Sequence, residues 1–136
     1  MLLLDTNALL WLSGGSSRLG RSARSMIKGA IDSGSAFFSA ISVWETAVLV
    51  RKGRYMLGQS VDAWRADLLD VGLSEAPLDG RVAALAGSLD GLHPDPADRF
   101  IAATAIRLHA KLLTSDERLI QWASAPGGPG CFDACR

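Results

Sequence analysis

The stretch His93–Asp116, HPDPADRFIAATAIRLHAKLLTSD, decides the fold class of this chain. It begins with two aspartates around a proline, continues with the apolar spacing of an amphipathic helix, and ends in a short apolar strand followed by Asp116. Asp95 before Pro96 is typical of a helix N-cap followed by proline at the first helical position. A helix that leads directly into a buried strand is half of a parallel α/β unit, and ligands of such sheets bind at the carboxyl ends of the strands.

Short apolar runs alternate with helical patterns on both sides of this segment. Strands are predicted at 2–4, 36–38, 71–75 and 111–114. Helices are predicted at 8–12, 21–31, 43–52, 61–69, 79–89, 95–109 and 115–122. This alternation predicts an α/β fold with a parallel sheet and right-handed crossovers.

Length and composition predict one domain over residues 1–125. The Pro- and Gly-rich residues 126–136 are expected to form a flexible tail, in which Cys131 and Cys135 are thiols and not zinc ligands. The net charge is zero, so a nucleic-acid partner requires a local basic patch. No apolar stretch approaches the roughly 20 residues of a membrane span, and the first residues lack the basic region of a signal peptide. We therefore expect a cytoplasmic protein.

Four acids lie near strand ends or helix starts, and each has a structural interpretation as well as a functional one. The structural interpretations are a helix start at Asp5, a capping box formed by Ser42 and Glu45, a favourable charge on the helix dipole at Asp98, and a helix capped by Ser115 with Asp116 in its first turn. For any one acid alone, the structural interpretation is the better one. Helix starts in a parallel α/β unit share one edge of the sheet, however, so all four are expected to converge.

Converging carboxylates repel one another, and hard divalent cations such as Mg²⁺ or Mn²⁺ supply the matching positive charge. Neither His93 nor His109 has a spacing that suggests a zinc ligand. Each is expected to be solvated, because one lies in a loop and the other at a helix end.

Four segments of the chain resemble those of PIN-domain proteins, and more narrowly the VapC-type ribonuclease toxins of type II toxin–antitoxin systems. In the order of that family, they read MLLLDTNALLWL, SAISVWETAVLVRKGR, DPADRFIAATA and KLLTSDERL, and the resemblance extends from Met1 to Trp122. It implies a three-layer α/β/α sandwich around a central parallel sheet of four to five strands. It also implies an Mg²⁺- or Mn²⁺-dependent endoribonuclease that hydrolyses RNA phosphodiester bonds, is inhibited by a cognate antitoxin protein and forms a homodimer.

The resemblance also assigns roles to individual residues. The catalytic and metal-binding acids it implies are Asp5, Glu45, Asp98 and Asp116, with Thr6, Asn7 and Ser115 as supporting residues. Members of the family usually have a further short strand after the last helix, whereas no strand pattern is present here from Ala123 onward.

Several basic residues are expected to contact RNA or a partner. The RNA-binding candidates are Arg51, Lys52 and Arg54, whereas Arg21, Arg24 and Lys28 are better explained as a solvated helix face. Arg99 is expected to pair with an acid, the RNA or the antitoxin.

Two other functions stay open at this point. One is a non-catalytic PIN-like module that binds RNA or protein, and the presence of all four acids argues against it. The other is a metal-dependent phosphatase. No D-x-D motif follows the first strand and no lysine follows a late strand at the expected place, which argues against this function.

Overall fold

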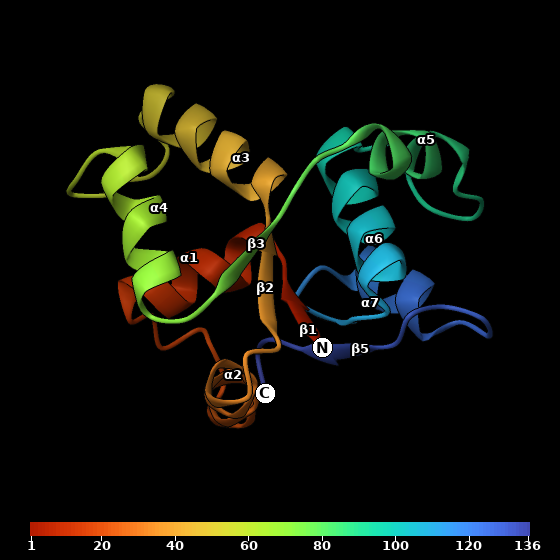
Figure 1. Cartoon of the computed structure of the whole chain (residues 1–136), viewed down its shortest axis with the longest axis horizontal. Helices are drawn as coiled ribbons and strands as arrows, with labels where there is room; N and C mark the ends of the chain where they lie inside the picture. The colour runs from red at the N-terminus through yellow and green to blue at the C-terminus, as the bar shows by residue number, and fades with distance from the viewer.

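The computed structural model describes all residues, 1–136, and its centre is one parallel sheet with helices on both faces (Figure 1). The five strands are β1 (Leu2–Leu4), β2 (Ala36–Ser39), β3 (Ser74–Ala76), β4 (Lys111–Thr114) and β5 (Cys131–Asp133). The seven helices are α1 (Thr6–Gly14), α2 (Arg21–Asp32), α3 (Ala40–Arg51), α4 (Val61–Asp70), α5 (Gly80–Ser88), α6 (Pro96–Leu108) and α7 (Glu117–Ser124). The predicted α/β class is confirmed. None of the helices combines the length and apolar character that a membrane crossing requires.

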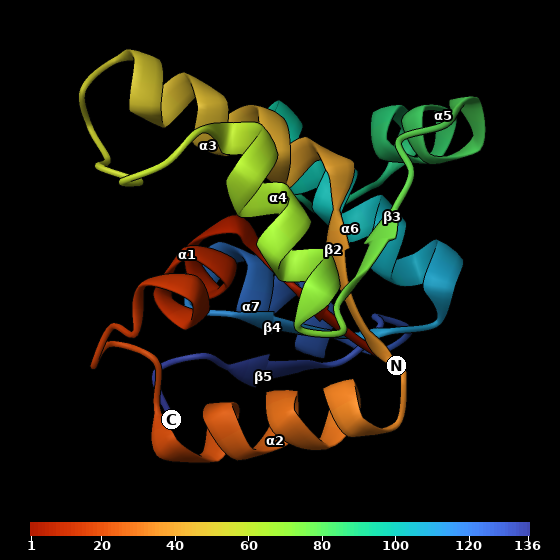
Figure 2. The ribbon, with the colours of Figure 1, turned by 60° about the vertical axis from the view of Figure 1, so that its left-hand side comes forward.

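The three layers follow from the alternation of side chains along the strands. On one face, Leu2 and Leu4 of β1 pack with Leu9 of α1 and with residues of α2 and α4. On the other face, Leu3 packs with Ile101 of α6 and with residues of α7. Both faces of β1 are therefore buried, as the unbroken apolar run predicts. The helix α5 lies outside α6, and Figure 2 shows α2 and α7 separated by the sheet.

The strand order is β3-β2-β1-β4-β5, with all neighbours parallel. The chain moves outward in one direction from β1 to β3, and then returns to the other side of β1 with β4. The sheet therefore has a topological switch point between β1 and β4, and ligands of open α/β sheets bind at the carboxyl end of this point. Asp5 follows β1 and Asp116 lies two residues after β4, so both acids lie at this edge.

The expectation of a C-terminal segment without regular structure is wrong. Residues 131–133 form β5, which pairs with Leu112, Leu113 and Thr114 of β4. The sequence does not predict this strand because it has only three residues and follows a Pro- and Gly-rich turn, so the local pattern carries little signal. Its pairing partner lies about 20 residues earlier in the chain, and only the completed sheet supplies the contacts that define it.

Two predicted helix caps are also wrong. The helix α3 begins at Ala40, and its N-cap is Ser39, whose hydroxyl accepts a hydrogen bond from the backbone N–H of Ile41. Ser42 and Glu45 therefore lie inside the helix and form no capping box. The last helix is capped by Asp116 and not by Ser115. The predicted cap at Asp95, followed by Pro96, is confirmed.

Candidate active site

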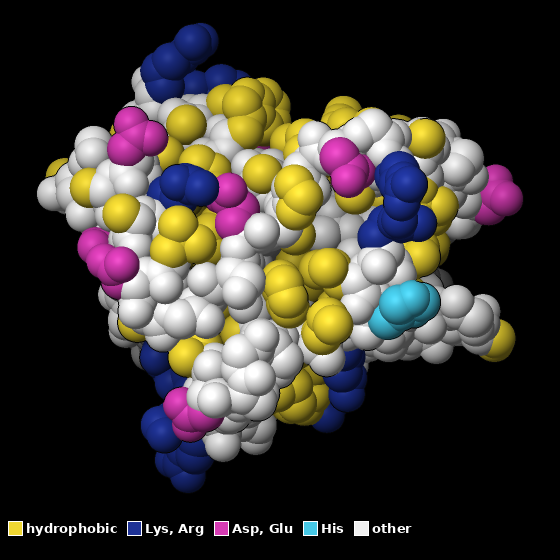
Figure 3. Space-filling view, viewed as in Figure 1, with side chains coloured by type: hydrophobic (Ala, Val, Ile, Leu, Met, Phe, Trp, Pro, Cys, Tyr) yellow, Lys and Arg dark blue, Asp and Glu magenta, His cyan; other side chains and the backbone are white.

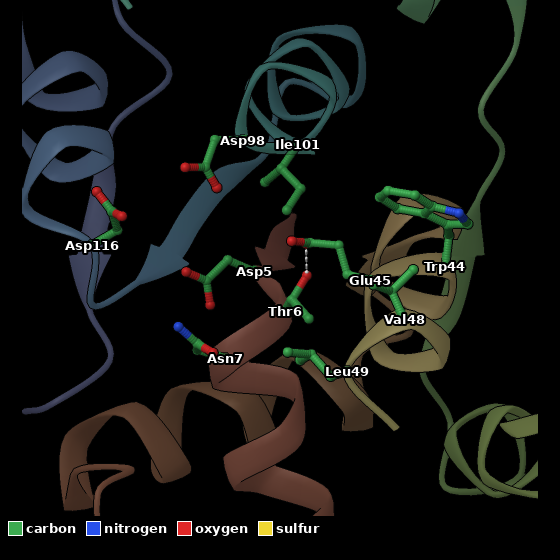
Figure 4. A pocket seen from close by; sticks show the side chains of 10 residues that line it. All are labelled: Asp5, Thr6, Asn7, Trp44, Glu45, Val48, Leu49, Asp98, Ile101 and Asp116. Carbon is green, nitrogen blue, oxygen red and sulfur yellow. Dashed lines mark hydrogen bonds between the residues drawn. The ribbon is translucent and has the colours of Figure 1, made fainter. Parts of the chain in front are cut away.

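A pocket of about 260 Å³ lies at the carboxyl edge of the sheet, where the switch point predicts a ligand site (Figure 4). Four segments supply its walls: the start of α1, residues 44–49 of α3, the first turns of α6 and the cap of α7. The lining side chains are Asp5, Thr6, Asn7, Trp44, Glu45, Val48, Leu49, Asp98, Ile101 and Asp116. All four predicted acids are among them, although they come from positions between 5 and 116 of the chain.

Asp5 is the most deeply placed acid, with 5% of its surface exposed. Its Oδ1 accepts a hydrogen bond from the backbone N–H of Ala8 at 2.8 Å, which caps α1. Its Oδ2 accepts one from the hydroxyl of Thr114 at the end of β4. Burial raises the pKa of Asp5 to about 6, and the charges of Asp98 and Glu45 add to this effect against the two hydrogen bonds. The structural and functional interpretations of Asp5 are thus both compatible with its position.

Glu45 points toward the start of α1, where its Oε1 accepts a hydrogen bond from the hydroxyl of Thr6 (Figure 4). The same hydroxyl lies 2.9 Å from Oγ of the buried Ser42. Burial raises the pKa of Glu45, and the charges of Asp98 and Asp95 raise it further. Thr6, expected as a supporting residue, thus bonds Glu45 and not Asp5, and it connects α1 to α3.

A residue of the loop before α6 contacts the carboxylate of Asp98. Its Oδ2 lies 2.7 Å from Nε2 of His93, a side chain that is only 10% exposed. The expectation of a solvated His93 is wrong, because the α5–α6 loop folds over the start of α6. Burial is the main cause that raises the pKa of Asp98; repulsion by Asp95 and Asp116 adds to it, and the His93 contact opposes it.

Asp116 lies at the N-terminus of α7. Its Oδ1 accepts hydrogen bonds from the backbone N–H groups of Arg118 at 2.9 Å and Leu119 at 3.2 Å. Its Oδ2 lies 3.8 Å from the guanidinium of Arg118. These contacts are those of a helix cap, so the carboxylate is oriented by its own helix.

Asn7, predicted as a supporting residue, lines the pocket with an exposed side chain. Ser115, the other predicted hydroxyl, does not line it. The neighbouring Thr114 does contact the acids: it is fully buried, donates to Asp5 and accepts from the backbone N–H of Asp116 at 3.0 Å. A polar residue that ends an apolar, buried strand is the signal in the sequence that points to Thr114.

Arg99 forms no ion pair with an acid, one of its three expected partners. Its guanidinium instead donates to backbone carbonyls of the α5 end and the α5–α6 loop. The acceptors are Ala86 at 2.8 Å, Leu92 at 2.9 Å and Leu89 at 2.6 Å. Arg99 thereby fixes the loop that carries His93.

The predicted RNA-binding residues do not line the pocket. Arg51, Lys52 and Arg54 are exposed at the far end of α3, about two turns beyond Glu45. Figure 3 shows Lys and Arg side chains gathered at that end, and a notch between the α3–α4 and α5–α6 halves of the molecule. Trp44, 59% exposed, lies on α3 at the pocket.

No three acid, histidine or cysteine side chains converge on one point in this structure. The hydrogen bonds explain this arrangement, because each of the four carboxylates is turned toward a donor of the protein: Ala8 and Thr114, Thr6, His93, and the α7 backbone. The pocket nevertheless collects four carboxylates and no basic side chain. Oxygen donors without nitrogen or sulfur fit a hard divalent cation in preference to zinc.

Comparison with known proteins decides the family. Residues 2–124 match the model of the PIN domain. The chain belongs to the PIN-domain family. This PIN domain is 37% identical over 122 residues to Ribonuclease VapC22 of Mycobacterium tuberculosis (strain ATCC 25618 / H37Rv). The aligned region covers 86% of this chain and 88% of that protein.

Two solved structures share the fold of this PIN domain. FitAB bound to an IR36 DNA fragment has a TM-score of 0.67 and 21% identity, covering 100% of this chain and 96% of that chain. FitAcB from Neisseria gonorrhoeae has a TM-score of 0.65 and 22% identity, covering 98% of each chain. The α/β/α architecture implied by the sequence resemblance is therefore confirmed.

Proposed function

We propose that this PIN domain is an Mg²⁺- or Mn²⁺-dependent endoribonuclease and the toxin of a toxin–antitoxin pair. The observation that carries the proposal is the meeting of Asp5, Glu45, Asp98 and Asp116 in one pocket at the switch point of the sheet. Membership of the PIN family and the similarity to a protein named as a ribonuclease support it.

Electrostatics supports a cation in this pocket. Burial and mutual repulsion raise the pKa of Asp5, Glu45 and Asp98, so the ionised cluster is unfavourable without positive charge nearby. No lysine or arginine lines the pocket to supply that charge. We propose Asp5, Asp98 and Asp116 as the metal ligands, with Glu45 as a further ligand or as the group that orients the water. The chemistry supplied by a bound ion is stabilisation of phosphate charge and activation of water.

Other residues of the chain orient the acids or contact the RNA. Thr114 and the Ala8 backbone hold Asp5 in one orientation, and Thr6 does the same for Glu45. In the proposal, Arg51, Lys52 and Arg54 attract the RNA backbone from the end of α3, at a distance from the acids. Asn7, exposed at the pocket, contacts the RNA near the reacting phosphate.

A partner protein fits the surface beside the acids. Trp44 is largely exposed, and Val48 and Leu49 follow it along the pocket wall. Large exposed apolar side chains beside a polar site mark an interaction surface. We propose that the cognate antitoxin covers these side chains and thereby closes the pocket to RNA. We also propose that the protein is a homodimer, as the resemblance to the family implies.

The first prediction separates the two aspartates that flank the start of α6. Asp98→Asn is expected to lower the rate of RNA cleavage by about a hundredfold or more, because a lost charge at the reacting centre costs this much. Asp95→Asn is the matched control and is expected to leave the rate nearly unchanged, because asparagine also caps helices well. Cleavage of total RNA with Mn²⁺, with Mg²⁺ and with excess chelator measures both.

Undiminished cleavage in chelator contradicts the metal, and full activity of Asp98→Asn contradicts the assignment of the acids. Hydrolysis of a phosphomonoester without RNA cleavage indicates the phosphatase instead. Folding of both variants is checked by circular dichroism.

A further inference from the structure

A second cavity, of about 640 Å³, lies between the α5–α6 loop and the α7–β5 loop. Figure 1 shows these loops at the right of the molecule, and Figure 3 shows the surface hollowed between them. Its lining includes His93 of the first loop, Arg118, Gln121 and Trp122 of α7, and Ala125 of the second loop. None of these residues was assigned to RNA binding from the sequence, and none lines the acid pocket.

Two side-chain contacts connect the lining of the second cavity with the lining of the acid pocket. His93 lines the second cavity, and its Nε2 contacts Oδ2 of Asp98 at 2.7 Å. Arg118 also lines the second cavity, and its guanidinium lies 3.8 Å from Oδ2 of Asp116. Both Asp98 and Asp116 line the acid pocket. Asp98 and Asp116 therefore each lie next to a side chain that lines the second cavity.

The second cavity lies away from the acids, along α7 and beside Ile106 near the end of α6. From Asp98 at the acid pocket to Ile106 in the cavity lining, α6 advances by about 12 Å. On α7 the lining runs from Arg118 near the first turn to Ala125 just past the last. The distance from the acids to this cavity is comparable to the length of one nucleoside. A phosphate bound at the acids can therefore have its neighbouring nucleoside in the second cavity.

The chemistry of the lining fits a base better than a phosphate. Trp122 is half-buried against the core, so its indole is held in place, and Gln121 is exposed with an amide that both donates and accepts. The cation in the lining, Arg118, is already near Asp116, and Asp90 adds a negative charge. Proteins read unstacked RNA bases with aromatic rings, guanidinium planes and side-chain amides, which is the set present here.

We propose that this cavity binds the base of a nucleotide adjoining the scissile phosphate of single-stranded RNA, and so contributes to the choice of the cleavage site. Trp122 stacks on the base, and Gln121 hydrogen-bonds its edge. The proposal rests on the ribonuclease function proposed above and deepens it, because it names a base-reading subsite beside the acids.

The test uses two substitutions in the cavity lining, at positions that do not line the acid pocket. Gln121→Ala removes the amide, and Ala125→Trp fills the cavity from an exposed position at the end of α7. Gln59→Ala is the matched control, because Gln59 is also exposed but lines an apolar cavity beside α4. Each is combined with Asp5→Asn to prevent cleavage, and fluorescence anisotropy measures its affinity for labelled hexamers of U, C, A and G.

We expect Gln121→Ala to weaken binding of the preferred hexamer about 3- to 10-fold and to reduce the difference among the four. Ala125→Trp is expected to weaken binding of that hexamer about tenfold or more, because base stacking is lost. Gln59→Ala is expected to bind like its parent. In the Asp5 background, where cleavage plays no part, equal affinities of all three variants and the parent for every hexamer overturn the proposal.

The second readout is RNA cleavage by proteins that carry the same substitutions but keep Asp5. We expect the nucleotide preference beside the cut in total RNA to change in Gln121→Ala and Ala125→Trp. An unchanged preference in both overturns the subsite while leaving the ribonuclease function intact. If the unaltered protein cleaves no RNA, the proposed function fails, and the hexamer affinities still decide whether the cavity reads a base.

Discussion

His93 shows how far the environment of a single residue can depart from its local sequence. In the sequence it is an isolated histidine in a loop, flanked by Gly91, Pro94 and Pro96. In the structure it is nine-tenths buried, bonded to Asp98 through Nε2, and its Nδ1 has no partner. A buried polar atom without a partner is costly. The cost is consistent with a function for the position, and we interpret His93 as the residue that orients Asp98.

The second prediction concerns this orientation. His93→Ala is expected to lower the affinity of the protein for Mn²⁺ about 10- to 100-fold, as loss of a group that orients a metal ligand commonly does. The control is His109→Asn, because His109 is exposed at a left-handed helix end that asparagine tolerates. Isothermal titration with Mn²⁺ measures both. Wild-type affinity in a folded His93→Ala protein contradicts the orienting role.

The third prediction follows from the raised pKa of Asp5. Its pKa is about 6 in the folded protein against 3.8 in the unfolded chain, so the folded state binds the proton more tightly. The stabilisation from this proton is complete below about pH 4 and is lost as the pH rises through 6. Asp5→Asn avoids the loss. Without divalent cations at pH 8, the free energy of unfolding of the variant is therefore expected to exceed that of the wild type by up to about 3 kcal/mol.

Thermal unfolding in chelator at pH 4 and pH 8 measures this effect. The difference between the two proteins is expected to shrink toward pH 4, where Asp5 is protonated in the folded state and is close to its pKa of 3.8 in the unfolded chain. Asp70→Asn, at an exposed position that ends α4, serves as the control and is expected to show no such trend. A lower melting temperature of Asp5→Asn at pH 8 contradicts the unfavourable burial of this charge.

At the scale of elements, β5 is the clearest departure from the prediction. The strand adds backbone hydrogen bonds to β4, from Leu112 to Gly130 at 3.0 Å and from Ala134 to Thr114 at 2.9 Å. The second of these bonds orders the strand end that carries Thr114, and Thr114 holds Asp5. The C-terminal strand thus supports the active-site pocket, although it contributes no lining residue.

The fourth prediction tests the docking of this element. Ala134 is fully buried against the core, whereas the next residue, Cys135, is exposed. Ala134→Asp is expected to lower the free energy of unfolding by at least about 3 kcal/mol, because it buries a charge without a partner. Cys135→Asp is expected to have little effect. Denaturant unfolding measures both. Equal stability of the two variants indicates that these residues do not dock on the sheet.

The helix α3 is the other element whose start matters. Because Ser39 is the cap, Glu45 lies in the second turn and its side chain is free to bond Thr6. The capping-box spacing of Ser42 and Glu45 is a coincidence of sequence. The buried position of Ser42 beside Thr6 supports the pocket in a different way.

At the scale of the whole molecule, a net charge of zero conceals an uneven distribution. The carboxylates converge at the switch point, and exposed cations lie at the far end of α3 and along α2. Figure 2 shows these two helices at opposite ends of the molecule. A strand of RNA that reaches the acids can therefore contact one cationic group without contacting the other.

The fifth prediction compares the two groups. In the Asp5→Asn background, serine at 51, 52 and 54 is expected to weaken binding of single-stranded RNA and to reduce the slope of log affinity against log salt by up to about 2. The control replaces Arg21, Arg24 and Lys28 of α2 and is expected to change the slope little. Anisotropy titrations from low to high salt measure both. Equal effects of the two replacements contradict a localised RNA path.

The sequence by itself determined the class of fold, the places of its first four strands along the chain (the third, β3, begins three residues later than predicted) and the four acids of the pocket. These features are encoded locally: apolar runs define buried strands, and Asp5, Asp98 and Asp116 lie at helix starts that a parallel sheet brings to one edge. Asp95 as a cap is local in the same sense, because proline follows it.

Only the tertiary structure decided which groups hold the acids and what lies beside them. Thr114 bonds Asp5 across 109 positions of the chain, and Thr6 bonds Glu45 across 39. The burial of His93, the strand β5 and the second cavity also depend on segments that meet only when the sheet closes. Helix caps and hydrophobic spacing are set by neighbours within a few residues, whereas these contacts are set by packing between distant segments, which no local pattern records.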